Sequence, residues 1–196
     1  GPIYYYGSEE QREEWLPRLC RGKMLAAFGL TEPGAGSDAG SSKTRAELRG
    51  DHWVINGAKI FITNSANPLT GVVLVQAITG QKEDGKRELS CLLVPRNAPG
   101  FAAQEMKKKM MWRSSNTGEL FFDDCPVPRE NLLGKRGDGF HQMLAILDGG
   151  RLSIGAMGLG GAQGAFEMAL HYANTRIQFG RPISSFHINA FKLADM

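Results

Sequence analysis

The sequence is poor in cysteine, and it contains no long apolar run. Only three of its 196 residues are cysteines, and Cys20, Cys91 and Cys125 stand far apart. An odd, scattered set argues against a framework of disulfide bonds and suits a reducing compartment. No run of about 18 or more apolar residues is present, which rules out a transmembrane helix. The first residues, Gly1 to Tyr4, resemble neither a signal peptide nor an Arg-rich transit peptide.

An excess of charge of one sign is also lacking. The sequence has 23 Lys and Arg against 20 Asp and Glu, a formal net charge of +3, and 42% of its residues are apolar. This balance is typical of a globular chain and gives no electrostatic argument for nucleic-acid binding. The length fits about one or two domains.

Motifs of several catalytic classes are missing. The four histidines show no metal-ligand spacing among themselves or with the cysteines. There is no Gly-x-Ser-x-Gly elbow. The segment Gly34-x-Gly36-x-x-Ala39 matches only part of a dinucleotide fingerprint, and a hairpin rather than a helix is expected after it. The sequence therefore predicts neither a metal site nor a Rossmann fold.

What is present begins with a helix over residues 8–22. Ser8 is placed as its N-cap, and Gln11 stands at the third position after it, as in a capping box. Gly22 is a C-terminal stop signal. Pro17 lies inside the segment and is expected to disturb or divide the helix.

A β region follows this helix. The expected strands are residues 43–48, 52–55, 58–63, 71–79, 88–94, 101–106 and 119–122. Asn56-Gly57 is the strongest hairpin signal in the chain, because both turn positions of such a hairpin need positive φ. Strands of this number and spacing predict a barrel or a sandwich.

The pattern becomes helical after Pro128. Apolar residues from Phe140 to Leu147 fit the 3.6-residue period and predict a long helix over about residues 138–175, with Gly149-Gly150 as a candidate kink. A second helix is expected from residue 184 or 185. Since it is still running at the last residue, the sequence predicts a longer protein.

Two features of the β region have chemical potential. The segment from Leu30 to Asp38 combines hydroxyls with glycines, whose backbone N–H groups can turn toward a phosphate or a polar ring edge. Composition alone, however, favours an ordinary surface loop. Phe61 and Thr63 share one side of a strand, where they could flank a planar cofactor or simply pack in the sheet. The basic run 107–109 is expected to be a solvated loop.

Six motifs stand in a fixed order along nearly the whole chain. They are residues 28–38, 56–64, 126–134, 147–151, 176–182 and 193–196. In this order and at this spacing they resemble the acyl-CoA dehydrogenase family of flavoenzymes. The resemblance implies a multi-domain α and β fold, with a central β-barrel or sandwich flanked by helical-bundle segments. Residues 1–23 would end an N-terminal helical domain, 24–134 would form the middle β-barrel domain, and 135–196 would start a truncated C-terminal helical domain.

The resemblance also implies FAD as the cofactor. The residues expected to bind it are Phe28, Leu30, Thr31, Gly36, Ser37, Phe61, Ile62, Thr63, Arg176, Phe179 and His187. Thr31 would bond the pyrimidine side of the flavin, and the Thr63 hydroxyl would reach flavin N5. Arg176 would meet the pyrophosphate of an FAD bound mainly by a neighbouring subunit. Phe61 stands where the family frequently has Trp, and His187 where it often has Gln, toward the adenosine end of FAD.

An acyl-CoA thioester is the implied substrate, with contacts expected from Ser37, Asp148 and Arg151. A carboxylate would remove the α-proton, the β-hydrogen would leave as hydride to flavin N5, and the electrons would pass to an electron-transfer flavoprotein. Most members carry the catalytic Glu at a place that would lie beyond Met196, and Gly150 occupies the alternative place. No catalytic residue is therefore expected among the 196, which are predicted to be inactive alone.

Several further expectations accompany the resemblance. The motif at residues 147–151 is most similar to short-chain or butyryl-type members of fatty-acid β-oxidation. A homodimer or homotetramer is expected, without nucleic-acid or membrane partners, in the bacterial cytoplasm or the mitochondrial matrix. The alternatives are an acyl-CoA oxidase that reacts with oxygen, a non-catalytic relative that binds nucleic acid or a partner, and a dehydrogenase for a branched, aromatic or dicarboxylic acyl group.

Overall fold

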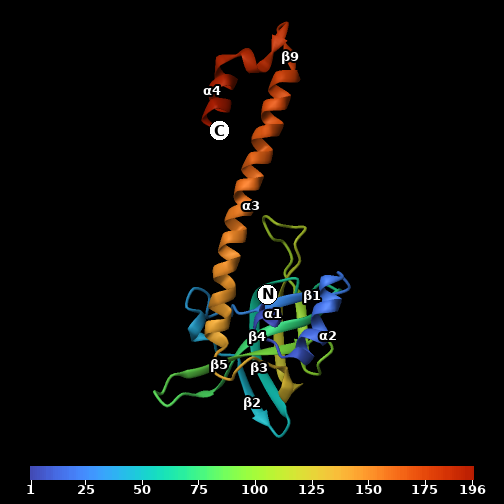
Figure 1. Cartoon of the computed structure of the whole chain (residues 1–196), viewed down its shortest axis with the longest axis vertical. Helices are drawn as coiled ribbons and strands as arrows, with labels where there is room; N and C mark the ends of the chain where they lie inside the picture. Colours follow the sequence, from blue (N-terminus) through green and yellow to red (C-terminus); the bar gives the residue numbers. More distant parts are fainter. The chain divides into compact units, whose positions relative to one another are not determined.

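A computed structural model describes all 196 residues, which divide into two compact units, Gly1–Ile146 and Leu147–Met196. The helices are α1 (Pro2–Tyr6), α2 (Glu9–Cys20), α3 (Gly139–Thr175) and α4 (His187–Asp195), with short 3₁₀ turns at Ala39–Ser41, Arg129–Asn131 and Ile183–Ser185 (Figure 1). The strands are β1 (Leu25–Gly29), β2 (Arg45–Arg49), β3 (His52–Thr63), β4 (Thr70–Gln81), β5 (Arg87–Pro95), β6 (Phe101–Glu105), β7 (Thr117–Pro128), β8 (Leu132–Leu133), β9 (Ile177–Gln178) and β10 (Arg181–Pro182).

The first unit is built on an eight-stranded sheet. Its strand order is β6-β7-β3-β2-β4-β5-β8, and β1 pairs in parallel with β4. One cluster of buried side chains draws on β1, β2, β3, β4, β5 and β7, including Trp53, Val75, Leu92 and Leu120. Strands far apart in the order thus share one core, so the sheet curls around it. This architecture confirms the expected fold class.

The capping of α2 is as predicted. The Ser8 hydroxyl accepts from the Gln11 backbone N–H at 3.2 Å, and the Gln11 side chain accepts from the Ser8 N–H at 3.1 Å. At the other end Gly22 has φ +66°, and the N–H of Lys23 bonds back to the Arg18 carbonyl. The expected break at Pro17 is wrong, because α2 continues through it to Cys20. Pro17 costs the helix one hydrogen bond, the one its missing N–H would make to the Glu13 carbonyl, but the last turn still forms, with the Arg21 N–H bonding to the Pro17 carbonyl at 3.2 Å.

The predicted hairpin at Asn56-Gly57 is also wrong. Residues 52–63 form one strand, β3, and the turn lies earlier, at Gly50 and Asp51 between the paired residues Arg49 and His52. Gly57 does use a positive φ, +147°, but it does so where the pairing of β3 with β7 shifts register. The glycine therefore lies opposite a β-bulge, at which β7 has one residue more than β3.

The other strands follow the prediction with shifted limits. The hairpin of β4 and β5 is present around residues 81–86, and β6 begins at Phe101 as expected. The prediction for 119–122 was too short, because β7 extends to Pro128 through a segment with two prolines. The short strand β8 was not predicted, and the apolar run before Leu30 forms the strand β1.

The long predicted helix is present as α3, which continues in helical hydrogen bonding through Gly149-Gly150. In the second unit α3 is followed by a two-residue turn at Phe179 and Gly180, both at positive φ, which joins β9 to β10. α4 follows and begins at His187, whereas the prediction placed its start at residue 184 or 185. None of the helices combines the length and the apolarity that a membrane crossing requires.

Candidate functional site

The loop that was singled out in the sequence leaves β1 and turns back on itself at once. The backbones of Glu32 and Ala35 bond to each other in both directions, at 3.0 and 3.1 Å, which closes a tight turn over Pro33-Gly34. Leu30 before the turn is buried, whereas Gly36 and Ser37 after it are exposed. Phe28, on β1, is half-buried beside Leu74. The loop thus has a fixed base and an exposed tip.

A buried ion pair holds the base of this loop. Lys59, on an inward-facing position of β3, is fully buried, and its Nζ donates to Glu32 Oε1 at 2.8 Å and to the Leu30 carbonyl at 3.1 Å. The Glu32 carboxylate also accepts from the backbone N–H groups of Lys43 and Thr44, at 2.7 and 3.1 Å. Every polar atom of the pair therefore has a partner, which is the condition for burying two charges.

The pKa of Glu32 reflects this environment. Burial by itself would raise the pKa of the carboxyl, but the hydrogen bond from Lys59 and the backbone donors outweigh it, so the pKa is lowered from 4.5. Burial lowers the pKa of Lys59, and the adjacent Glu32 carboxylate offsets part of that effect. The ammonium nitrogen and the carboxylate oxygen lie 2.8 Å apart, so each group stabilises the charged form of the other.

The end of β3 lies against the same loop. The Ile60 N–H donates to the Thr31 carbonyl at 2.9 Å, which ties half-buried Thr31 to the strand. A register shift between Lys59 and Ile62 then moves the side chains by one position. Ile62 enters the core, while Phe61 and Thr63 point outward, as their shared side predicted. Any contact of Ile62 with a ligand would have to use its main chain.

Phe61 is strained and exposed. Its φ is +62°, a value that bulky residues rarely adopt, and its ring is 61% exposed. Phe61 and Thr63 line a hollow of about 510 Å³ with the neighbouring loop, in which Met110, Met111 and Trp112 are also exposed. An aromatic ring that strain holds out of the core marks a candidate binding wall.

The basic run before this loop is only partly solvated. Lys107 and Lys108 are exposed as expected. Lys109 differs, because its Nζ donates to the Trp112 carbonyl at 2.8 Å, to Thr117 Oγ1 at 3.0 Å and to the Ser115 carbonyl. Lys109 therefore departs from the expected solvated loop only in part, and its bonds hold the loop that borders the hollow beside Phe61.

The other predicted site residues lie in the second unit, Leu147–Met196. Asp148 and Arg151 form an exposed ion pair one turn apart on α3. The rings of Phe179 and Phe186 meet edge to face, with their centroids 6.0 Å apart. The ring of His187 stacks on that of Phe191, with a centroid distance of 5.7 Å. Arg176, Phe179 and His187 are all exposed. The exposed guanidinium of Arg176 forms no ion pair with a carboxylate of this chain.

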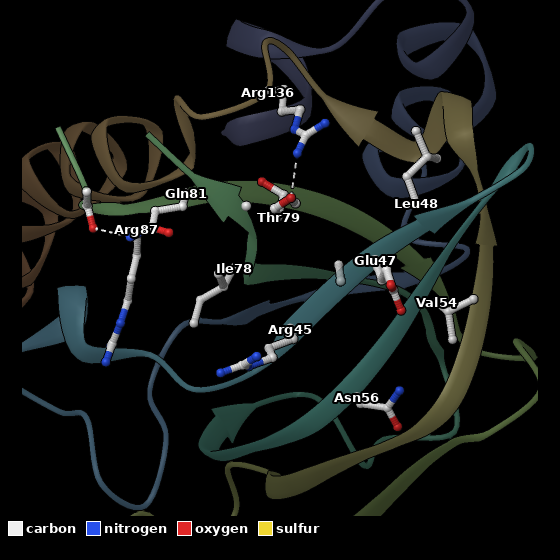
Figure 2. Close-up of a pocket in the computed structure, with 13 residues that line it drawn as sticks. Arg45, Glu47, Leu48, Val54, Asn56, Ile78, Thr79, Gln81, Arg87 and Arg136 are labelled. Atoms are coloured by element: carbon white, nitrogen blue, oxygen red, sulfur yellow. Dashed lines mark hydrogen bonds between the residues drawn. The ribbon is translucent and has the colours of Figure 1, made fainter. Parts of the chain in front are cut away.

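A larger hollow, of about 930 Å³, lies where β2 and β4 diverge after the single pair Arg45 and Ile78 (Figure 2). Arg45, Arg87 and Arg136 line it, and Arg136 donates to the Thr79 carbonyl at 2.6 Å. None of the predicted site residues borders this hollow. This hollow is therefore not the candidate functional site, although it is larger than the one beside Phe61. The candidate site is formed by the loop after β1 and by the end of β3.

Sequence reasoning missed the roles of Glu32 and Lys59. A usable signal was present, because Lys59 stands on the inward side of a strand whose other inward residues are apolar. A lysine in such a place needs a carboxylate partner. The hollow between Phe61 and the loop of Met110 to Trp112 gave no comparable signal.

Two family models match the sequence. The one described as the middle domain of acyl-CoA dehydrogenase covers residues 27–125, and the one described as its C-terminal domain covers residues 137–196. A relative from Bacillus subtilis (strain 168), named probable acyl-CoA dehydrogenase YngJ, is 50% identical over 195 residues, which are 100% of this chain and 51% of the relative.

Solved structures show the same similarity. Butyryl-CoA dehydrogenase from Megasphaera elsdenii is 41% identical with a TM-score of 0.88, over 99% of this chain and 50% of that one. An acyl-CoA dehydrogenase from Bacillus anthracis, complexed with FAD, is 42% identical with a TM-score of 0.89, over 99% of this chain and 32% of that one. The chain spans about half the length of the curated relatives it matches.

Proposed function

The chain belongs to the acyl-CoA dehydrogenase family, and from this premise we propose that it supplies the flavin- and thioester-binding part of an FAD-dependent enzyme that introduces an α,β double bond into an acyl-CoA. The observation that carries the proposal is the exposed wall made by Phe61 and Thr63 beside the clamped loop at Thr31. The family identity indicates the reaction class, and these side chains provide a surface on which the flavin would bind.

The residues present fit a flavin. The isoalloxazine ring is planar and largely apolar, with hydrogen-bonding atoms at its edge. Phe61 offers an exposed aromatic face at a hollow of about 510 Å³, and Thr63 offers a hydroxyl on the same side of the strand. That volume lies within the usual range for small-molecule sites, roughly 300 to 1,000 Å³.

The cofactor, when bound, accepts the β-hydrogen as hydride and so provides the redox chemistry. The proposed task of this chain's residues is alignment. Thr31 and Thr63 would orient the ring by hydrogen bonds, Phe61 would cover one face, and Gly36 and Ser37 would present backbone and hydroxyl donors to cofactor and thioester. Phe28, Leu30 and the main chain of Ile62 would support this wall from behind.

The second unit is proposed to serve the anionic ends of both ligands. Asp148 and Arg151 would contact the CoA portion of the substrate. Arg176, whose guanidinium has no carboxylate partner here, would bind the pyrophosphate of FAD held mainly by a neighbouring subunit, with Phe179 and His187 near it. This assignment requires a homodimer or a homotetramer.

We place no catalytic base among these residues. Position 150, where a minority of the family carries it, is a glycine without an ionisable group. Electrons would leave to an electron-transfer flavoprotein. We also retain the division into an N-terminal helical part (1–23), a middle β domain (24–134) and a C-terminal helical part (135–196), which the two matched ranges support. Similarity to butyryl-CoA dehydrogenase supports a short acyl chain.

The decisive experiment is an anaerobic titration of the FAD-loaded protein, at its full natural length, with straight-chain acyl-CoAs of increasing length. Bleaching of the oxidised flavin band by a short acyl-CoA would support both the half-reaction and the chain length. If FAD is bound and no straight-chain thioester bleaches it, the short-chain proposal is wrong. Rapid reoxidation of the bleached flavin by air would indicate an oxidase instead.

A further inference from the structure

We propose that the buried ion pair of Glu32 and Lys59 is a positioning device, which sets Thr31 against the Phe61–Thr63 end of β3 before the flavin binds. The inference rests on the proposed function. Neither residue is exposed enough to contact a ligand, since the side chains of Lys59 and Glu32 are 0% and 5% exposed. They act through the backbone of the residues that do line the site.

The geometry converges on Thr31. The ammonium of Lys59 holds Leu30 by its carbonyl and Glu32 by its carboxylate, which are the two residues on either side of Thr31. The Thr31 carbonyl itself accepts from Ile60, the residue after Lys59. Two consecutive residues of β3 therefore fix three consecutive residues of the loop. The residue that follows them on the strand is the strained, exposed Phe61.

The same carboxylate also closes the far end of the loop. Glu32 accepts the backbone N–H groups of Lys43 and Thr44, where the chain enters β2. Both ends of the segment that carries Gly36 and Ser37 are thus tied to one side chain. The exposed tip is held by its ends, so its backbone donors occupy a restricted region of space.

Stability alone is a weak reason for such a pair. Two charges lose their hydration when they are buried, and an apolar pair of similar volume often folds at least as well. An apolar pair would nevertheless lack the directional bonds to Leu30, Lys43 and Thr44. The arrangement therefore specifies one position of the loop relative to β3, and this is what a preorganised binding site requires.

The test separates positioning from folding. Removing one partner would leave a buried, unpaired charge and could unfold the protein. The informative variant is therefore the double substitution Glu32→Gln with Lys59→Met, made in the protein at its full natural length. The matched control is Asp84→Asn with Lys86→Met, which removes an exposed ion pair on the turn between β4 and β5. For each protein we would measure the melting temperature without cofactor, amide hydrogen exchange, and FAD affinity by flavin fluorescence.

The double variant is expected to melt close to the unsubstituted protein, to exchange faster over residues 31–44, and to bind FAD about tenfold more weakly, a change that corresponds to ~1.4 kcal/mol. The control pair should change none of these. Unchanged exchange over residues 31–44, or a loss of affinity no larger than the loss of folded protein, would overturn the positioning role. If the unsubstituted protein bound no FAD, the proposed function would fail, and exchange would still decide whether the pair orders the loop.

Discussion

The hydroxyl of Thr44 lies 2.6 Å from the point where a Cβ on Gly57 would stand. Gly57 lies in the middle of β3, beside the bulge at which β7 has one residue more than β3, and Thr44 is the residue whose N–H bonds to Glu32. A glycine in the β-sheet thus lets β3 approach the exit of the candidate loop. The middle of β3 and the end of the loop that carries Gly36 and Ser37 meet at this contact.

Gly57→Ala is expected to destabilise the protein by about 2 kcal/mol or more. The new methyl group would clash with Thr44 and force a side chain to adopt φ +147°. The control is Gly50→Ala, where φ is +64° but no atom lies within 4 Å of the new Cβ, so only backbone strain of about 1 kcal/mol is added. Urea unfolding of both variants gives the comparison. Equal losses would mean that Thr44 moves aside freely.

The stability should fall in acid because of Glu32. Its pKa is lowered from 4.5 in the folded state, so its contribution is fully present above that pH and is lost as the pH falls through the folded-state pKa. The double variant Glu32→Gln with Lys59→Met, which leaves no unpaired buried charge, should lose less stability than the unsubstituted protein as the pH falls below 4.5. Denaturant midpoints measured from neutral to acid pH test this.

Asp84→Asn is the control for that titration. The pKa of Asp84 is also lowered, by hydrogen bonds from Lys86, but the pair is exposed. Its effect should be small and should fade with added salt, whereas the Glu32 effect should persist. Identical acid profiles for the double variant Glu32→Gln with Lys59→Met and for the unsubstituted protein would contradict a contribution of the Glu32 carboxylate to stability.

Phe61→Ala should separate binding from folding. The ring is exposed, so its removal should change the unfolding free energy by no more than about 0.5 kcal/mol. FAD affinity should fall, because the aromatic wall is lost. Ile62→Ala should instead lower the free energy of unfolding by about 2 to 5 kcal/mol, because the Ile62 side chain lies in the core and is only 2% exposed. Paired unfolding and flavin-fluorescence measurements decide, and a large stability loss in Phe61→Ala would place the ring in the core instead.

Ser8→Ala should weaken the start of α2 by about 1 kcal/mol. The substitution removes the acceptor for the Gln11 N–H. Gln11 also donates to the carbonyls of Glu130 and Leu132, at 2.7 and 3.0 Å, so the cap holds the residue that ties α2 to the 3₁₀ turn Arg129–Asn131 and to β8. Ser8→Asn, which keeps a capping acceptor, should lose little by comparison in the same thermal melts.

Local patterns in the sequence determined much of the molecule. The capping box of Ser8 and Gln11, the stop at Gly22 and the length of α3 depend on residues within a few positions of one another, and all of them were predictable. The shared side of Phe61 and Thr63 followed from strand geometry, although the bulge that turns them outward did not. The ordered motifs sufficed to identify the family.

Tertiary structure decided where distant segments meet. Glu32 and Lys59 are 27 residues apart, and nothing local in either segment specifies their bond. The turn lies at Gly50-Asp51 and not at Asn56-Gly57, because pairing with β7 continues β3 through the glycine, opposite a bulge in β7. The ring of Phe61 is exposed for a similar reason, because the pairing of β3 with β7 shifts register between Lys59 and Ile62. Local propensity proposes turns and strands, but the register between strands, and the burial of one charged pair, depend on contacts that only the folded sheet provides.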